Sequence, residues 1–170
     1  MEIHVPVKKI NPNAKLPTYG SDQAAGFDLY AAEEVILAPG ETKSVNLGLA
    51  FAIPKGYEIQ IRPRSGNSKK TKLRISNAPG TIDADYRGEV AVLLDNTSNL
   101  SDGTEKALFS IKGEKEESNI VYSEGTYIIY KHDRIAQGVL TEVPRAIFSE
   151  TDVLEETVRG SAGFGSTGIK

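Results

Sequence analysis

Apolar and polar residues alternate along much of this chain, and this period of two residues constrains its fold more than any other feature. From residue 45 to residue 53 every second side chain is apolar. Because successive side chains of a strand point to opposite faces of a sheet, the alternation predicts a half-buried strand, which Pro54 ends. The pattern resumes over residues 57–61 after a Lys-Gly turn, so we predict that the two strands pair as a hairpin.

Further strands follow from the same pattern, and helical periodicity is almost absent. We predict strands over residues 90–94, 126–131 and 135–143, and weaker ones over 3–8, 27–31, 34–37 and 72–75. The exception is a short helix that Ser65 would cap, ending at Lys70 or Lys72. Short strands separated by turn residues favour an antiparallel sandwich or barrel, so the predicted fold class is all-β.

The residue types that are missing exclude several classes of site. The chain has no Cys, which excludes a disulfide framework, a thiolate zinc site and a cysteine nucleophile. Its two histidines, His4 and His132, cannot form a three-histidine metal site. A net charge of −3 disfavours nonspecific binding to nucleic acid. No apolar run approaches the roughly 18 residues of a membrane span, and the first residues do not resemble a signal peptide, so we predict a cytoplasmic protein.

The length of 170 residues corresponds to one domain, and two segments differ from the rest in composition. Residues 97–125 are polar, and a structureless loop of that length is uncommon, so they form either an extra hairpin or a functional insertion. Residues 159–170 contain four glycines and three hydroxyl side chains. We therefore predict a single β-domain over 1–158, with an insertion over 97–125, and a C-terminal arm over 159–170.

The C-terminal arm partly matches two phosphate-binding motifs but has the context of neither. A dinucleotide fingerprint and a Walker A loop both need a preceding strand and a following helix, and Ser166 stands where the Walker lysine would be. The groups that remain suit an anion: glycine backbone N–H groups, the hydroxyls of Ser166 and Thr167, and the guanidinium of Arg159. Phe164 could stack on a flat ring. The alternative is a frayed terminus.

Three shorter segments carry isolated polar groups. Arg64, Ser65 and Gly66 directly follow a predicted strand, and a hydroxyl, backbone amides and an arginine at a helix start suit a phosphate. The alternative is a helix cap with a solvated basic flank. Asp28 stands in an apolar stretch, where a buried acid needs a partner, and Gln137 lies near the start of a predicted strand. Each of these is ordinary by itself.

Residues 77–89 form the densest polar segment of the chain. On a strand, Asp83 and Asp85 would point to the same side. One carboxylate could then act as a general base on a water while Tyr86 packs on a ligand ring. The alternative is a loop with aspartates in Asx-turns.

Taken together and in order, five segments resemble the motifs of the deoxyuridine triphosphatase (dUTPase) family in its homotrimeric all-β form. They are Ala-Gly-Phe-Asp-Leu at 25–29, Pro-Arg-Ser-Gly at 63–66, Gly-Thr-Ile-Asp-Ala-Asp-Tyr-Arg-Gly-Glu at 80–89, Asp-Arg-Ile-Ala-Gln at 133–137 and Arg-Gly-Ser-Ala-Gly-Phe-Gly-Ser-Thr-Gly at 159–168. The resemblance implies a jelly-roll-like antiparallel barrel with one short helix and a flexible C-terminal arm. It also implies a homotrimer whose subunits share their active sites.

The resemblance further implies a role for each segment. Asp83 would deprotonate water for in-line attack on the α-phosphorus of dUTP, giving dUMP and pyrophosphate. Asp28 would help to hold the triphosphate and its Mg²⁺ through water, so that no side chain binds the metal directly. The phosphates would be contacted by Arg64, Ser65, Gly66, Gln137, Arg159, Ser166 and Thr167. Uracil and deoxyribose would be contacted by Asn77, Gly80, Thr81, Ile82, Tyr86, Phe164 and Gly165.

The implied activity limits uracil incorporation into DNA and supplies dUMP for dTTP synthesis, with no direct binding to nucleic acid or membrane. One alternative is a dCTP deaminase on the same fold. The other is a regulatory dUTPase that binds a protein through residues 97–125, which resemble the insertion of dUTPases from phages of Gram-positive bacteria and so imply a phage or prophage origin. Residues 67–70 are polar where the family has a small apolar helix, which leaves phosphate contacts by Arg62, Lys69 and Lys70 open.

Overall fold

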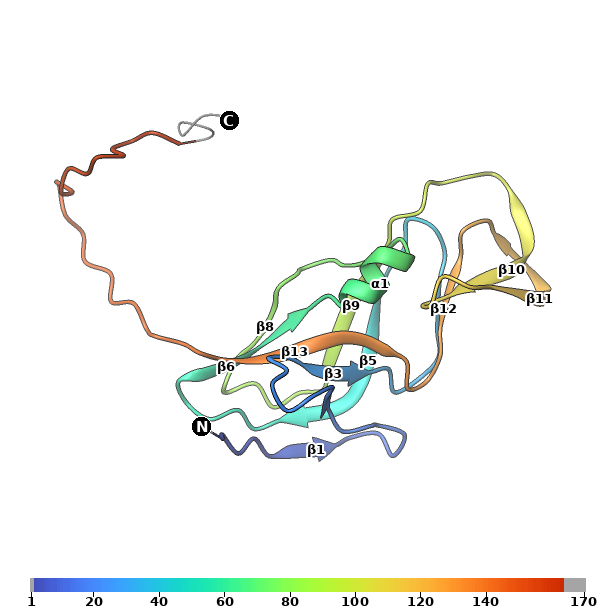
Figure 1. Cartoon of the computed structure of the whole chain (residues 1–170), viewed down its shortest axis with the longest axis horizontal. Coiled ribbons are helices and arrows are strands. Elements are labelled where there is room, and N and C mark those ends of the chain that lie inside the picture. Colours follow the sequence, from blue (N-terminus) through green and yellow to red (C-terminus); the bar gives the residue numbers. More distant parts are fainter. Residues whose placement is uncertain (1, 164–170) are drawn as a thin grey trace.

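The computed structural model describes residues 2–163 and consists mainly of strands (Figure 1). Its helix, α1, is short and spans Ser65–Lys70. The strands are β1 (Val7–Lys9), β2 (Thr18–Tyr19), β3 (Phe27–Tyr30), β4 (Val35–Leu37), β5 (Thr42–Phe51), β6 (Tyr57–Arg62), β7 (Leu73–Ile75), β8 (Gly80–Ile82), β9 (Val90–Asn96), β10 (Thr104–Ser110), β11 (Lys115–Ser123), β12 (Tyr127–Ile129) and β13 (Arg134–Glu142). The predicted all-β class is confirmed.

The strands form three sheets around one hydrophobic core. Their orders are β1-β5-β9-β7, β2-β3-β13-β6-β8 and β11-β10-β12-β4. Strand β10 is parallel to β12, and the other strand pairs are antiparallel. Strand β9 alternates buried with less buried side chains, as its sequence pattern predicts. Leu29 and Ile59 of the second sheet pack in the same core as Leu47 and Val92 of the first.

The predicted hairpin between β5 and β6 is wrong. Strand β5 pairs with β1 on one edge and β9 on the other, whereas β6 pairs with β13 and β8 in a different sheet. A strand has only two hydrogen-bonding edges, and both edges of β5 are occupied by strands distant in sequence. The chain between Phe51 and Tyr57, which contains Pro54, therefore carries the backbone from one sheet to the next.

The predicted short helix is confirmed, but the predicted cap is wrong. Arg64 occupies the N-cap position in an extended conformation and makes no side-chain capping bond, while Ser65 is the first helical residue. The helix ends at Lys70 because Thr71 is extended, and both its N–H and its hydroxyl donate to the Asn67 carbonyl.

The segment 97–125 contains an extra hairpin, β10–β11, one of the two structures predicted for it. Its inner strand belongs to the core, because Ala107 and Leu108 are buried and β10 pairs with β12. Its outer strand is tied to the body through the Tyr130 hydroxyl, which donates to the Glu116 carboxylate and whose pKa this bond raises to about 12. The hairpin is therefore a packed part of the domain.

Sequence patterning missed short strands and placed no element at the end of the described chain. Strand β8 was hidden because turn residues surround it, and β1 is shorter than the predicted strand over 3–8. After β13, residues 143–163 leave the body of the molecule (Figure 1). Ile147 and Phe148 of this segment are 95% and 94% exposed. Within residues 2–163, no helix is both long and apolar enough to cross a membrane.

One glycine of β13 is required by close packing, and we predict that Gly138→Ala destabilises the fold. A Cβ atom at Gly138 would lie 2.5 Å from Cζ of the Phe27 ring, which covers it from the neighbouring strand. We expect the free energy of unfolding to fall by about 1–3 kcal/mol because of this overpacking. Urea denaturation at one fixed protein concentration measures the change.

The matched control is Gly20→Ala, because a Cβ there meets nothing within 4 Å. This variant should unfold within about 0.5 kcal/mol of the original chain. Equal stability of the Gly138 and Gly20 variants would contradict the packing argument.

Candidate functional site

A buried carboxylate held by two arginines forms the centre of the first group of predicted site residues. Asp28 on β3 is only 5% exposed. Its Oδ1 accepts a hydrogen bond from Nε of Arg64 at 2.9 Å, and its Oδ2 accepts one from Nη1 of Arg134 at 3.1 Å. A buried charge is costly unless it is paired and hydrogen-bonded. The two guanidinium groups meet this requirement and leave the centre with a positive surplus.

The sheet aligns Gln137 with this centre although the residues are far apart in sequence. In the pairing register, Gln137 of β13 lies opposite Asp28 of β3 on one side and Arg62 of β6 on the other. Arg62 itself donates from Nε and Nη2 to the Gln60 amide oxygen. The register therefore places the predicted phosphate ligand Gln137 beside Asp28. The Arg62 guanidinium is hydrogen-bonded to Gln60 of the same strand.

Helix α1 brings the predicted phosphate residues Ser65 and Gly66 next to Arg64. Both are exposed, and a Cβ at Gly66 would meet nothing within 4 Å. Asn67, which sequence reasoning did not assign to the site, donates from Nδ2 to the Arg134 carbonyl at 2.9 Å, and its Oδ1 lies 3.4 Å from Nη1 of Arg64. The polar character of residues 67–70, already unusual for the family, was the signal for this link.

The second group of predicted residues surrounds the loop that follows β8. Asp83 is exposed and lines two cavities. One, of about 410 Å³, is also lined by Thr81, Ile82 and Tyr86. The other is an open cleft of about 1150 Å³ that Phe148 also lines. A carboxylate at the edge of two open spaces can reach both a water and a ligand, as a general base requires.

Two contacts shape this second group. The Tyr86 hydroxyl donates to the Glu89 carbonyl at 3.0 Å, which folds the side chain back along its own loop. A Cβ at Gly80 would lie 3.3 Å from the Asn77 amide nitrogen and 3.3 Å from Cβ of Ile61. The backbone at Gly80 therefore packs closely against Asn77 and Ile61.

Within residues 2–163, the two groups line different cavities. The cavities that contain Asp83 are not lined by Asp28, Arg64 or Gln137. Arg159 lies on the segment that leaves the body, where its Nε donates to the Ala162 carbonyl (Figure 1). The remaining predicted residues, Phe164, Gly165, Ser166 and Thr167, lie outside the described residues.

The residues of the first group suit a magnesium ion that is bound through water, without a direct bond from a side chain. Among residues 2–163, no cluster of three His, Asp or Glu side chains is placed to hold a metal ion. Both oxygens of Asp28 already accept from arginines, yet each keeps a lone pair with which it can accept from a metal-bound water. Mg²⁺ commonly keeps several waters and binds substrate phosphates, so this donor set suits it.

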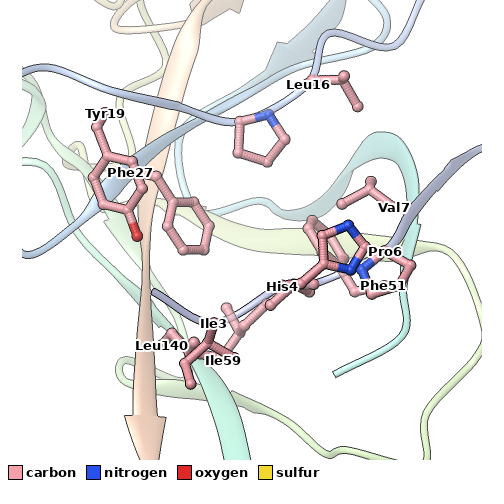
Figure 2. A pocket seen from close by; sticks show the side chains of 12 residues that line it. Ile3, His4, Pro6, Val7, Leu16, Tyr19, Phe27, Phe51, Ile59 and Leu140 are labelled. Carbon is pink, nitrogen blue, oxygen red and sulfur yellow. The ribbon is translucent and has the colours of Figure 1, made fainter. Parts of the chain in front are cut away.

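An apolar groove lies apart from both groups. Its volume is about 410 Å³, and it is lined mainly by apolar side chains of the N-terminal segment and of β3, β5, β6 and β13 (Figure 2). Phe27 and Tyr19 form one wall, with ring centroids 5.6 Å apart in an edge-to-face arrangement. Open apolar surface of this kind typically marks an interface.

Comparison with solved structures defines the class of protein. The dUTPase of Staphylococcus bacteriophage 80alpha, solved with dUPNHPP, matches with a TM-score of 0.93 and 33% identity, covering 98% of this chain and 99% of that one. The dUTPase from phage phi11 of S. aureus, in the structure that visualises its species-specific insert, matches with a TM-score of 0.85 and 32% identity, covering 91% and 100%. The chain is thus an all-β protein with the jelly-roll-type fold of these phage enzymes.

Comparison of sequences narrows the class to a family. A family model described as dUTPase matches residues 12–101. The deoxyuridine 5'-triphosphate nucleotidohydrolase of Nautilia profundicola is 46% identical, over 95% of this chain and 96% of its own length. That of Helicobacter hepaticus is 40% identical over 98% and 90%. This chain belongs to the dUTPase family, which confirms the predicted family and the predicted class of enzyme.

The arginine pair predicts that Asp28→Asn destabilises the fold. An amide cannot balance two guanidinium groups, so we expect the free energy of unfolding to fall by about 1–3 kcal/mol. Urea denaturation measures the effect. Asp22→Asn is the control, because Asp22 is exposed, and it should change stability little. If Asp28→Asn were as stable as the original chain, the two ion pairs would contribute nothing to stability.

Proposed function

We propose that this chain hydrolyses dUTP to dUMP and pyrophosphate in a Mg²⁺-dependent reaction. One observation carries the proposal: the dUTPase motifs fold into two chemically complementary groups. The first is cationic around Asp28 and Arg64, and the second places Asp83 beside an open cavity. The activity would limit uracil in DNA and supply dUMP for dTTP synthesis, and the substrate, a cellular nucleotide, indicates the cytoplasm.

Asp83 is the general base in this proposal. Its carboxylate accepts a proton from a water, whose oxygen attacks the α-phosphorus in line with the bridging oxygen. The new P–O bond forms as the α–β phosphoanhydride bond breaks, and pyrophosphate leaves. Because Asp83 is exposed in the open cavity, a bound nucleotide can cover it and exclude bulk water.

The cationic group binds the triphosphate. Arg64, Ser65 and Gly66 contact the phosphates from the start of α1, and Gln137 meets the α-phosphate from β13. Arg159, Ser166 and Thr167 clamp the γ-phosphate from the C-terminal arm, residues 159–170. When bound, Mg²⁺ would neutralise phosphate charge, and Asp28 would help to hold it through water. Positioning and charge stabilisation of this kind are the main contributions that phosphoryl chemistry needs from a protein.

Strand β8 and the turns on either side of it select the base and the sugar. Asn77, Gly80, Thr81 and Ile82 form a tight wall that leaves no room for a 5-methyl group, in keeping with the close contacts at Gly80. Tyr86 packs against the deoxyribose and excludes a 2′-hydroxyl, and its fixed hydroxyl suits this role. Phe164 and Gly165 of the arm cover the uracil.

We further infer a homotrimer in which subunits share the site. The two groups lie around different cavities of one chain, so residues of a second chain must complete each site. Ile147 and Phe148, almost fully exposed on the departing segment, need an apolar surface to cover them. The apolar groove of this chain (Figure 2) would offer such a surface to the segment of a neighbouring subunit.

The substrate assay that tests this proposal is pyrophosphate release with Mg²⁺. We expect fast release from dUTP and little from dTTP, dCTP or UTP, because the wall at Gly80 excludes a methyl group and Tyr86 excludes a ribose. Ammonia release from dCTP would instead indicate the deaminase. No release from any nucleotide by a folded trimer would contradict the proposed activity.

Replacing the base should separate binding from hydrolysis. Asp83→Asn cannot accept the proton, so we expect pyrophosphate release to fall by at least about 100-fold, the lower range for general base catalysis, while dUTP still binds. Asp85→Asn is the matched control two residues away and should keep most activity. Full activity of the Asp83 variant would assign the base elsewhere.

A second candidate function rests on the outer strand of the inserted hairpin. Ile120 and Val121 of β11 are 61% and 54% exposed. The dUTPases of phage 80alpha are described as controlling the transfer of virulence genes. We infer that this strand is a docking surface for a protein partner that regulates, or is regulated by, the enzyme.

The partner surface predicts that Ile120→Lys with Val121→Lys leaves hydrolysis within about twofold, because exposed substitutions away from the site change little. Sedimentation should still show a trimer, and affinity for any partner of the unsubstituted enzyme should be lost. Deleting the hairpin would be a poor test, because β10 carries core residues. Dissociation of the trimer would instead identify the strand as a subunit contact.

A further inference from the structure

A polar cleft beside Arg64 is lined partly by the inserted hairpin. Its volume is about 340 Å³, within the range of roughly 300–1,000 Å³ that is typical of ligand pockets. Helix α1 and the turn between β12 and β13 form two of its sides. The turn between β10 and β11 forms the third, and contributes Lys112.

The position of Lys112 is determined by packing on both sides of it. Ile111 is buried at 8% exposure and belongs to the hydrophobic core. Gly113 has a φ of 76°, and a Cβ there would lie 2.6 Å from the Lys70 carbonyl oxygen. Only glycine accepts both the left-handed backbone and this close approach without strain. The turn is therefore seated against the end of α1.

The cleft has an excess of positive charge. Its lining includes Arg64, Lys70, Lys112 and Arg134 but only one carboxylate, Asp133. Both arginines share the single carboxylate of Asp28. Neither lysine forms an ion pair within the described part of the chain.

The one carboxylate of the lining, that of Asp133, already accepts a hydrogen bond from the backbone. Asp133 accepts a hydrogen bond from the Tyr130 backbone N–H at 2.9 Å. Burial raises the pKa of Asp133, whereas this bond and the nearby charge of Lys112 act in the opposite direction. His132, the remaining titratable group of the lining, has its Nε2 2.7 Å from the Asn13 carbonyl oxygen. Within residues 2–163, the two lysine ammonium groups make no ion pair, and each arginine keeps N–H groups beyond those that bind Asp28, so all four can donate to a ligand.

We propose that this cleft binds phosphate groups, with Lys112 and Lys70 as ligands next to Arg64. Phosphate is the matching chemistry because lysine ammonium groups and an arginine fork bind it by charge-assisted hydrogen bonds. The proposal rests on the proposed function, which assigns Arg64 to the triphosphate. Its occupant is either the terminal phosphates of bound nucleotide or a free diphosphate, the product of the same reaction. The inserted hairpin then contributes directly to ligand binding.

Binding measurements on five variants test this site. Lys112→Ala and Lys70→Ala remove the proposed ligands, and Lys112→Arg keeps the charge. Lys106→Ala, in the same hairpin, and Lys69→Ala, adjacent in α1, are matched controls, because neither residue lines the cleft. Calorimetry with dUpNHpp, dUMP and pyrophosphate gives the three affinities for each protein.

We expect dUpNHpp to bind roughly three- to tenfold more weakly to each alanine variant of the cleft, the loss that one hydrogen bond to phosphate produces. Affinity for dUMP should be unchanged, and Lys112→Arg should restore binding. This pattern assigns the cleft to the nucleotide's terminal phosphates. Weaker binding of pyrophosphate alone would assign it to the free diphosphate. Equal losses in the control variants, or no loss for either ligand, would overturn the proposal.

The same measurements distinguish failure of the proposed function from failure of the proposed phosphate site. If the unsubstituted chain bound neither dUpNHpp nor dUMP, the assignment of Arg64 to dUTP would be wrong. Pyrophosphate binding would still report whether the lysines form an anion site.

Discussion

The ion pairs of Asp28 with Arg64 and Arg134 are the interactions on which the rest of the site depends. They join residues 36 and 106 positions apart in the sequence. Because a buried carboxylate cannot remain unpaired without a large cost, both arginines are held against β3. Arg64 fixes the start of α1, and Arg134 fixes the start of β13. The proposed phosphate residues Ser65, Gly66 and Gln137 belong to these same elements.

The cationic group and the proposed general base lie in different parts of the fold. Charge gathers where α1, β3 and β13 meet, while the exposed Asp83 lies in a loop with its own cavity. The core extends into the β10–β11 hairpin through β10, so the hairpin is supported by the same packing that supports the site. This continuity explains how the hairpin can place Lys112 beside Arg64.

Local patterns predicted much of the fold, the family and the class of enzyme. Sequence patterning found β5, β6, β9 and β13, and the five motifs identified the family and singled out Asp28 and Arg64, which the structure joins in an ion pair. The β5–β6 hairpin was wrong because adjacency in sequence does not decide which edges are free. The cap at Ser65 was wrong because Arg64, pulled toward Asp28, takes the N-cap position. Asn67 was missed because its partners lie on a distant strand.

The sequence by itself determined where strands form, which residue types are available for chemistry and which family the chain belongs to. These properties follow from side-chain alternation and from short motifs, which are local. Only the tertiary structure decided which strands pair, that Asp28 is shared by two arginines and that Lys112 reaches the cleft. The reason is physical: hydrogen-bonding edges, ion pairs and close packing join residues far apart in the chain, and no local pattern encodes those distances.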